Sequence, residues 1–187
     1  MSLFRAYDAE YPPAQAPAGC FAVLGYIGGS ADHTWTVEEW RQASDNGRLR
    51  QGPIWGAQLE LDPYANGLAA VNAARALGWA EGRCIWLDME TWQASEWVAS
   101  FIAAVEGAGY AVGVYGSQST VFANPAGRGG YWVADWDGTP DVMPVATGHQ
   151  YLAGVPDDGT EPDQVTEINL DVFDVSVLDL FGRGPRI

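Results

Sequence analysis

The chain contains no lysine, and arginine supplies all nine of its basic residues, against 24 aspartates and glutamates. The formal net charge at pH 7 is therefore −15. Nucleic-acid binding needs clustered cations that displace counterions from phosphates, so this balance argues against a nucleic-acid partner. Arginine without lysine is typical of the coding bias of a GC-rich genome, and we draw no chemistry from it.

Cysteine and long apolar runs are also scarce. Cys20 and Cys84 each begin an apolar segment, which favours buried free thiols over a disulfide. The two cysteines and two histidines lack zinc-ligand spacing, and no loop has calcium-site spacing, so we expect no metal or other cofactor. No run is long enough for a membrane span, and Met1–Arg5 lacks the apolar segment of a signal peptide. We expect a chain that is cytoplasmic until released, or one that is virion-associated or extracellular.

Apolar and aromatic residues are plentiful. Hydrophobic residues make up 48% and aromatic residues 12% of the 187 residues, which is typical of a globular domain with a substantial core. We therefore predict a single domain over residues 1–187. Nine tryptophans and eight tyrosines weakly favour a carbohydrate ligand, because aromatic faces stack on sugar rings, although more than half of them are expected in the core.

Short apolar segments bounded by glycine, proline or acidic residues recur along the whole chain. Eight of them are predicted strands: Leu3–Asp8, Cys20–Ile27, Gly52–Gln58, Cys84–Thr91, Tyr110–Ser117, Tyr131–Trp136, Thr147–Leu152 and Ile168–Phe173. Several are apolar throughout, which is typical of strands that are buried on both faces of a parallel sheet.

Helical patterns lie between the early strands. Thr36 and Glu39 form a capping box that begins a helix ending near Gly47. Asp62-Pro63 can open a second helix that stops at Gly78, and Ala94–Gly107 has helical apolar spacing. Shorter helices are predicted around Val121-Phe122 and over Ser176–Phe181.

The connections in the second half are shorter. Residues 137–146 and 153–166 are rich in Gly, Pro and Asp and have no room for a full helix. The alternation predicts an α/β fold, specifically a TIM-like (β/α) barrel of eight strands with helices reduced in the second half. An open doubly wound sheet is the other fold that fits the pattern.

Polar side chains gather where the predicted strands end. Asp88 and Glu90 are two residues apart on one strand, so they share a face. In a parallel barrel all carboxyl ends meet at one mouth. The candidates there are Asp8, Gln58, Asp88, Glu90, Tyr115, Asp135, Trp136, Gln150, Tyr151, Asn169 and Asp171. Clustered carboxylates raise one another's pKa values, and carboxylate pairs with flanking aromatics carry out glycoside hydrolysis.

Other roles for these acids fit the same pattern. Asp88 and Glu90 could cap the next helix or pair with arginine, and together with Asp8 they could bind a divalent metal through oxygen atoms. Nucleophilic serine catalysis has no support, because Ser117 is not on a Gly-x-Ser-x-Gly elbow. His149 is expected to be structural or to contact a ligand at the rim.

Five segments resemble a known family in the same order. Ile85–Glu90 resembles the Asp-x-Glu strand of the family 25 glycoside hydrolases, the lysozyme-type muramidases. The later segments that are similar to that family are Gly113–Ser117, Tyr131–Trp136, Gln150-Tyr151 and Asn169–Asp171. Three further segments look closer to a related branch, the Rv2525c-like glycoside-hydrolase-like domains: Tyr26–Gly29, Pro53–Trp55 and the Ala-rich helix that ends at Leu77-Gly78.

This resemblance implies an eight-strand barrel that cleaves a cell-wall glycan, peptidoglycan above all. It implies that Glu90 is the general acid, that Asp88 assists it, and that Asp8 is the acid on the first strand. It also implies a substrate groove, whose expected lining residues are Tyr115, Asp135, Trp136, Gln150, Tyr151, Asn169 and Asp171. The last-strand Asp of the family falls on Asn169 here, with Asp171 two places on.

A non-catalytic role is the alternative. Asn169 in place of an acid, the missing signal peptide and the missing wall-binding repeats would suit a glycan-binding or structural module, for example a phage virion or tail component with assembly partners. Hydrolysis of a different polysaccharide would use the same barrel mouth.

Overall fold

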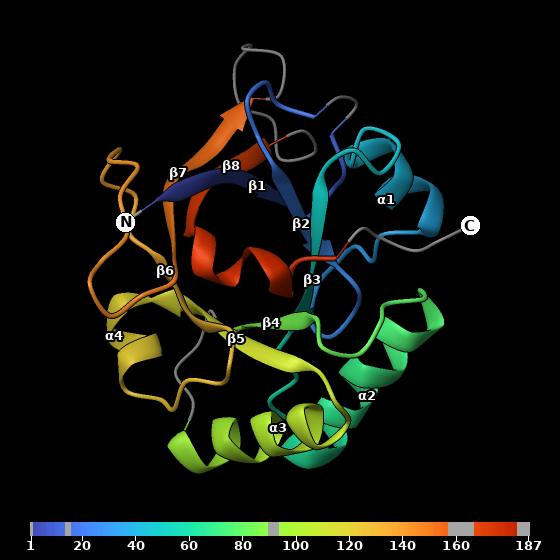
Figure 1. Ribbon diagram of the computed structural model, residues 1–187. Helices are drawn as coiled ribbons and strands as arrows, with labels where there is room; N and C mark the ends of the chain where they lie inside the picture. Colours follow the sequence, from blue (N-terminus) through green and yellow to red (C-terminus); the bar gives the residue numbers. More distant parts are fainter. Residues whose placement is uncertain (1, 14–15, 90–93, 157–166, 183–187) are drawn as a thin grey trace.

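The computed structural model describes residues 2–13, 16–89, 94–156 and 167–182. Eight strands close into a barrel in sequence order, which confirms the predicted barrel (Figure 1). The strands are β1 (Leu3–Ala9), β2 (Ala22–Tyr26), β3 (Arg50–Gly56), β4 (Cys84–Asp88), β5 (Ala111–Ser117), β6 (Gly130–Ala134), β7 (Gly148–Pro156) and β8 (Glu167–Asp174).

The last strand departs from the expected all-parallel arrangement. Strands β1 to β7 are parallel neighbours, whereas β8 is antiparallel to both β7 and β1. A parallel return requires a crossover of a dozen or more residues, and only residues 157–166 join β7 to β8. The beginning of β8, not its end, therefore lies at the barrel mouth, as the pairing of Asn169 with Asp8 shows.

The barrel interior is a packed aromatic core. Because side chains alternate along a strand, Phe4, Ala6 and Asp8 of β1 form a series that leads from the floor to the mouth. The interior cluster consists of Phe4, Ala6, Ala22, Leu24, Ile54, Cys84, Trp86, Ala111, Trp132, Phe173, Val177 and Phe181. The rings of Trp86, Trp132 and Phe173 contact one another, with centroids 5.2–5.8 Å apart. This core fills the barrel below the mouth.

A 3₁₀ helix closes the floor. This helix, η1 (Val175–Leu180), directly follows β8 and places Val177 and Phe181 against the interior cluster. The backbone of Gly182 exchanges hydrogen bonds with Gln51 at the start of β3. Figure 1 shows η1 crossing the middle of the barrel in this view. The site must therefore lie at the opposite end, where β1 to β7 finish.

Helices cover the outer face of the barrel mainly around β3, β4 and β5 (Figure 1). They are α1 (Val37–Ala43), α2 (Pro63–Ala76), α3 (Ser95–Gly107) and the short α4 (Gln118–Phe122). The predicted capping box is present at α1, with both the Thr36 and the Glu39 bonds made. The helix ends at Ala43, earlier than predicted, because Asp45, Asn46 and Gly47 all adopt positive φ angles.

The second half carries fewer helices, as the sequence predicted. Residues 135–147 join β6 to β7 without a helix, and α4 has only five residues. Within the described ranges, no helix is long and apolar enough to cross a membrane.

Candidate active site

Six polar side chains meet at the mouth of the barrel, each from a different strand. They are Asp8 (β1), Tyr26 (β2), Asp88 (β4), Tyr115 (β5), Gln150 (β7) and Asn169 (β8). Hydrogen bonds tie them into two groups, one around Asp8 and one around Asp88. The structure thus brings together five of the residues that the sequence predicted and adds Tyr26.

Asp8 is held by two amides. Its side chain is 4% exposed, its Oδ1 accepts a hydrogen bond from Asn169 Nδ2 at 2.9 Å, and its Oδ2 accepts one from Gln150 Nε2 at 2.8 Å. Burial raises the pKa of Asp8 to about 6, and the two amide donors act in the opposite direction. Asp8 is therefore a carboxylate whose two oxygens are both oriented by neighbours.

Asp88 ends the apolar strand β4 and is held by a phenol. Its side chain is 5% exposed, and its Oδ2 accepts a hydrogen bond from the hydroxyl of Tyr26 at 2.7 Å. Burial, and then the nearby charges of Asp88 and Asp8, raise the pKa of Tyr26 well above its usual range, so its hydroxyl keeps its proton. Glu90, the predicted general acid, lies outside the described residues.

Gln150 links the mouth to an exposed tryptophan. Its Oε1 accepts hydrogen bonds from the hydroxyl of Tyr115 at 2.9 Å and from Nε1 of Trp136 at 2.6 Å. Trp136 follows β6, and 64% of its surface is exposed. The Trp136 ring is thus anchored by its N–H at the mouth while most of its face is open to solvent.

Asp171 lies deeper than the sequence suggested. Because β8 runs away from the mouth, Asp171 pairs with Ala6 and not with a residue at the rim. It is fully buried, and its Oδ1 accepts a hydrogen bond from Trp132 Nε1 at 3.0 Å. Burial, and secondly the charge of Asp8, raise the pKa of Asp171 well above its usual range.

Two further predicted residues lie away from the cluster. The side chain of Asp135 is exposed, and its backbone oxygen lies 2.6 Å from Nε2 of His149. Tyr151 follows Gln150 on β7, its ring packs near His149, and burial raises the pKa of its hydroxyl. His149 also contacts the backbone oxygen of Asp141, so it fastens the loop that carries Trp136.

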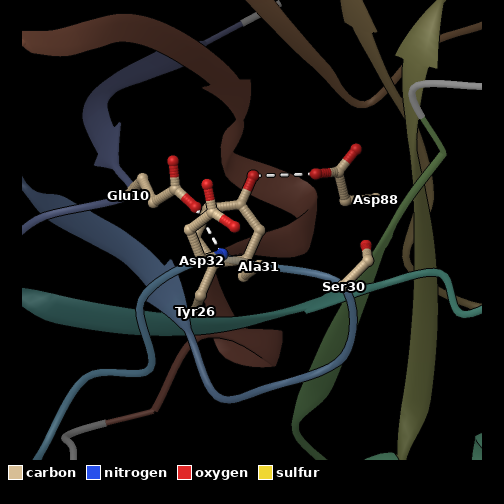
Figure 2. A pocket seen from close by; sticks show the side chains of 6 residues that line it. All are labelled: Glu10, Tyr26, Ser30, Ala31, Asp32 and Asp88. Carbon is tan, nitrogen blue, oxygen red and sulfur yellow. Dashed lines mark hydrogen bonds between the residues drawn. The ribbon is translucent and has the colours of Figure 1, made fainter. Parts of the chain in front are cut away.

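A pocket of about 190 Å³ opens beside Asp88. The lining residues are Glu10, Tyr26, Ser30, Ala31, Asp32 and Asp88. Figure 2 shows the Tyr26 hydroxyl pointing to Asp88, and Glu10 accepting a hydrogen bond from the backbone of Asp32. Three carboxylates and two hydroxyls give this pocket a polar, acidic lining suited to a hydroxyl-rich ligand. Among the residues that the structure describes, no group of three or more His, Cys, Asp or Glu could hold a metal ion.

A comparison with protein families matches residues 16–172 to the Rv2525c-like, glycoside hydrolase-like domain. The chain belongs to this family. The match confirms the resemblance found in the sequence. A sequence comparison with proteins of curated function gives no significant match.

Solved structures share the barrel of this Rv2525c-like domain. A family 25 glycosyl hydrolase from Bacillus anthracis superposes with a TM-score of 0.68 at 14% identity, over 96% of this chain and 93% of that one. The modular autolysin LytC from Streptococcus pneumoniae, solved with a synthetic peptidoglycan ligand, gives 0.66 at 12% identity, over 92% and 47%. The Tat-secreted protein Rv2525c from Mycobacterium tuberculosis gives 0.58 at 15% identity, over 91% and 95%. At these identities the likeness shows the fold.

Sequence reasoning missed Tyr26, Glu10 and Asp32 as lining residues of this pocket. Tyr26 could have been found, because it ends its strand and lies on the same face as Ala22 and Leu24. Glu10 and Asp32 come from loops after β1 and β2, and only the folded chain brings them next to β4.

Proposed function

We propose that this protein is a glycoside hydrolase that cleaves β-1,4 bonds in a cell-wall glycan, with peptidoglycan as its main substrate. The observation that carries the proposal is the mouth of the barrel, where the carboxylates of Asp8 and Asp88 are buried and Gln150 links Asp8 to the exposed Trp136. Paired carboxylates with aromatic neighbours suit glycoside chemistry, and the family and its structural neighbours support that interpretation.

In the proposed reaction the proton donor is Glu90, two residues beyond Asp88 in the sequence. Glu90 protonates the leaving glycosidic oxygen as the bond from that oxygen to the sugar C1 breaks. The N-acetyl carbonyl oxygen of the same sugar attacks C1 and forms a cationic ring, which the carboxylate of Asp88 stabilises. Water then opens this ring and gives its proton to Glu90, so the configuration at C1 is retained.

The hydrogen bond from Tyr26 suits the role proposed for Asp88. It occupies Oδ2 and helps to orient the carboxylate. A fixed, charged group can stabilise positive charge in the transition state without the cost of reorganisation. Asp8 would add negative charge on the other side of the mouth.

The test measures reducing ends released from purified peptidoglycan by the wild type, by Glu90→Gln and by Glu60→Gln. Glu60 is exposed in the loop before α2, so its variant is a matched control for the substitution itself. Loss of a general acid lowers the rate about 100-fold or more, and we expect this for Glu90→Gln alone. Equal rates for the wild type and Glu90→Gln would remove Glu90 from the mechanism.

A glycan-binding module without catalysis is the second candidate. The observation that favours it is Asn169, which stands where the resemblance expects an acid and which donates a hydrogen bond to Asp8. Cosedimentation with peptidoglycan, run on the same samples, separates the two candidates. Binding without release of reducing ends would favour the module.

A further inference from the structure

Gln150 occupies the centre of a hydrogen-bonded chain that runs from Asp8 to the protein surface. Its side chain is 1% exposed. Its Nε2 donates to Asp8 Oδ2 at 2.8 Å, and its Oε1 accepts from both Tyr115 and Trp136. Gln150 is therefore hydrogen-bonded to side chains from three different segments, namely β1, β5 and the loop after β6.

The orientation of this amide is dictated by chemistry. An indole N–H can only donate, so the group that faces Trp136 must be the oxygen of Gln150. A flipped amide would place two donors against each other at Trp136 and an oxygen against the carboxylate of Asp8. Trp136 and Asp8 thus impose the same orientation on the Gln150 amide.

We infer that Gln150 is a positioning residue that couples the exposed ring of Trp136 to the carboxylate of Asp8. Nε2 of Gln150 donates a hydrogen bond to Asp8 and so keeps Asp8 as an acceptor. A sugar that stacks on Trp136 moves its indole, and this indole orients the Gln150 amide. The first half of the inference stands on the hydrogen bonds alone. The second half, a glycan on Trp136, rests on the proposed function.

The surroundings of Asp8 make its charge sensitive to this donor. The titratable groups on other strands whose pKa values the charge of Asp8 raises are Tyr26 on β2, Tyr115 on β5 and Asp171 on β8. Each of them is neutral or negative, so none offsets the charge of Asp8. Its stabilising partners within the described structure are the amides of Gln150 and Asn169.

The first experiment follows the Asp8 carboxyl carbon by NMR during a pH titration of the free protein. Gln150→Met removes the donor without adding charge, and Gln150→Glu replaces it with an acceptor while keeping an oxygen for Tyr115 and Trp136. We expect both variants to raise the titration midpoint of Asp8 by about one pH unit or more, Gln150→Glu the most. Gln118→Glu, which adds the same charge on the exposed face of α4, should leave it unchanged.

An unchanged midpoint in a folded Gln150→Glu protein would overturn the positioning role. The amide spectrum of each variant shows whether it is folded, and Gln150→Glu suffices if Gln150→Met is not. This measurement needs neither substrate nor activity, so it is independent of the proposed function.

The second experiment repeats the titration with a saturating soluble chitin oligosaccharide. In the wild type, binding should shift the Asp8 midpoint, and in Trp136→Phe the shift should fall by at least about half, because phenylalanine keeps a stacking face but lacks the N–H. Equal shifts in the two proteins, or binding with no shift, would overturn the coupling. Failure of the wild type to bind any glycan would instead contradict the proposed function, and the free-protein titration would then decide the role of Gln150 by itself.

Discussion

Three aspartates inside the barrel are stabilised in three different ways. Asp88 accepts from a phenol, Asp8 accepts from two amides, and Asp171 accepts from one indole. Within the described residues, Oδ2 of Asp171 has no hydrogen-bond partner. Burying a charge with so little compensation is costly, so burial favours the neutral form of Asp171.

Replacing Asp171 with Asn should remove a pH dependence of stability. The raised pKa means that the folded protein binds this proton more tightly than the unfolded chain does. The contribution of this proton to the free energy of unfolding is fully present below the pKa of the unfolded chain, about 3.9. It declines as the pH rises, by up to about 1.4 kcal/mol per pH unit. Asp171→Asn keeps an oxygen for Trp132 and cannot ionise. We expect the wild type to lose more of its unfolding free energy than the variant between pH 4.5 and 7.5, up to a limit of about 4 kcal/mol set by that slope.

Urea denaturation of both proteins at the two pH values measures this difference. Asp179→Asn, on the exposed side of η1, controls for the loss of one carboxylate. If the free energies of unfolding of the wild type and Asp171→Asn change in parallel with pH, Asp171 does not hold its proton in the folded state.

At the level of elements, the loop after β2 determines the shape of the pocket beside Asp88. Ser30, Ala31 and Asp32 line that pocket, and the backbone N–H of Ser30 donates to the carbonyl oxygen of Gly56 at the end of β3. Gly29 makes this approach possible. Its φ is +87°, and a Cβ at this position would overlap the carbonyl oxygen of Gly56.

Gly29→Ala should therefore destabilise the protein and disturb the pocket. A methyl group there forces the loop away from β3, at a cost of about 1–3 kcal/mol, and the left-handed backbone adds about 1–2 kcal/mol. Gly47 has a φ of +82° and open space around it, so Gly47→Ala should show the backbone cost alone. Chemical denaturation of the two variants compares them directly. A smaller loss for Gly29→Ala than for Gly47→Ala would be inconsistent with the close packing of this loop.

The direction of β8 is the second element-level feature that shapes the site. An antiparallel β8 places Asn169 against Asp8 at the mouth and sends Asp171 into the aromatic core. A parallel β8 would have reversed their depths. The same two residues would then have exchanged positions, with Asp171 at the mouth and Asn169 in the core.

At the level of the whole molecule, net charge opposes the proposed substrate. The protein carries −15, and peptidoglycan is anionic, so the two repel each other at long range. The local site is acidic as well, since Glu10, Asp32 and Asp88 surround the pocket. Binding must then depend on contacts within the mouth, where stacking and hydrogen bonds act at short range.

The proposed hydrolysis of anionic cell walls should therefore increase with added salt. Between about 0.01 and 0.15 M ionic strength the screening length falls from about 30 to about 8 Å, which removes most of the long-range repulsion. We expect initial rates on peptidoglycan to rise several-fold over this range, and rates on an uncharged chitin oligosaccharide to change little. The same salt response on both substrates would contradict an electrostatic cause.

Much of this protein could be predicted from local sequence. Continuous apolar runs such as Cys84–Leu87 indicate strands buried on both faces, and the Thr36 and Glu39 capping box indicates the start of α1. Asp8, Asp88, Tyr115 and Gln150 lie near the ends of predicted strands. They could be predicted as neighbours because the carboxyl ends of parallel strands meet at one mouth. These features depend on alternation and capping, which act over a few residues.

Contacts between distant segments were decided by the tertiary structure. Tyr26 and Asp88 are 62 positions apart, and Gln150 and Asp8 are 142 apart. Which oxygen of Asp8 each amide reaches, and how deep Asp171 lies, depend on the register and direction of β8. Register and direction are set by closing the barrel and packing its core. Strand patterns in the sequence therefore indicated most of the carboxylates and aromatics of the site, whereas the loop residues Glu10 and Asp32 and the way each carboxylate is held depend on the closed barrel.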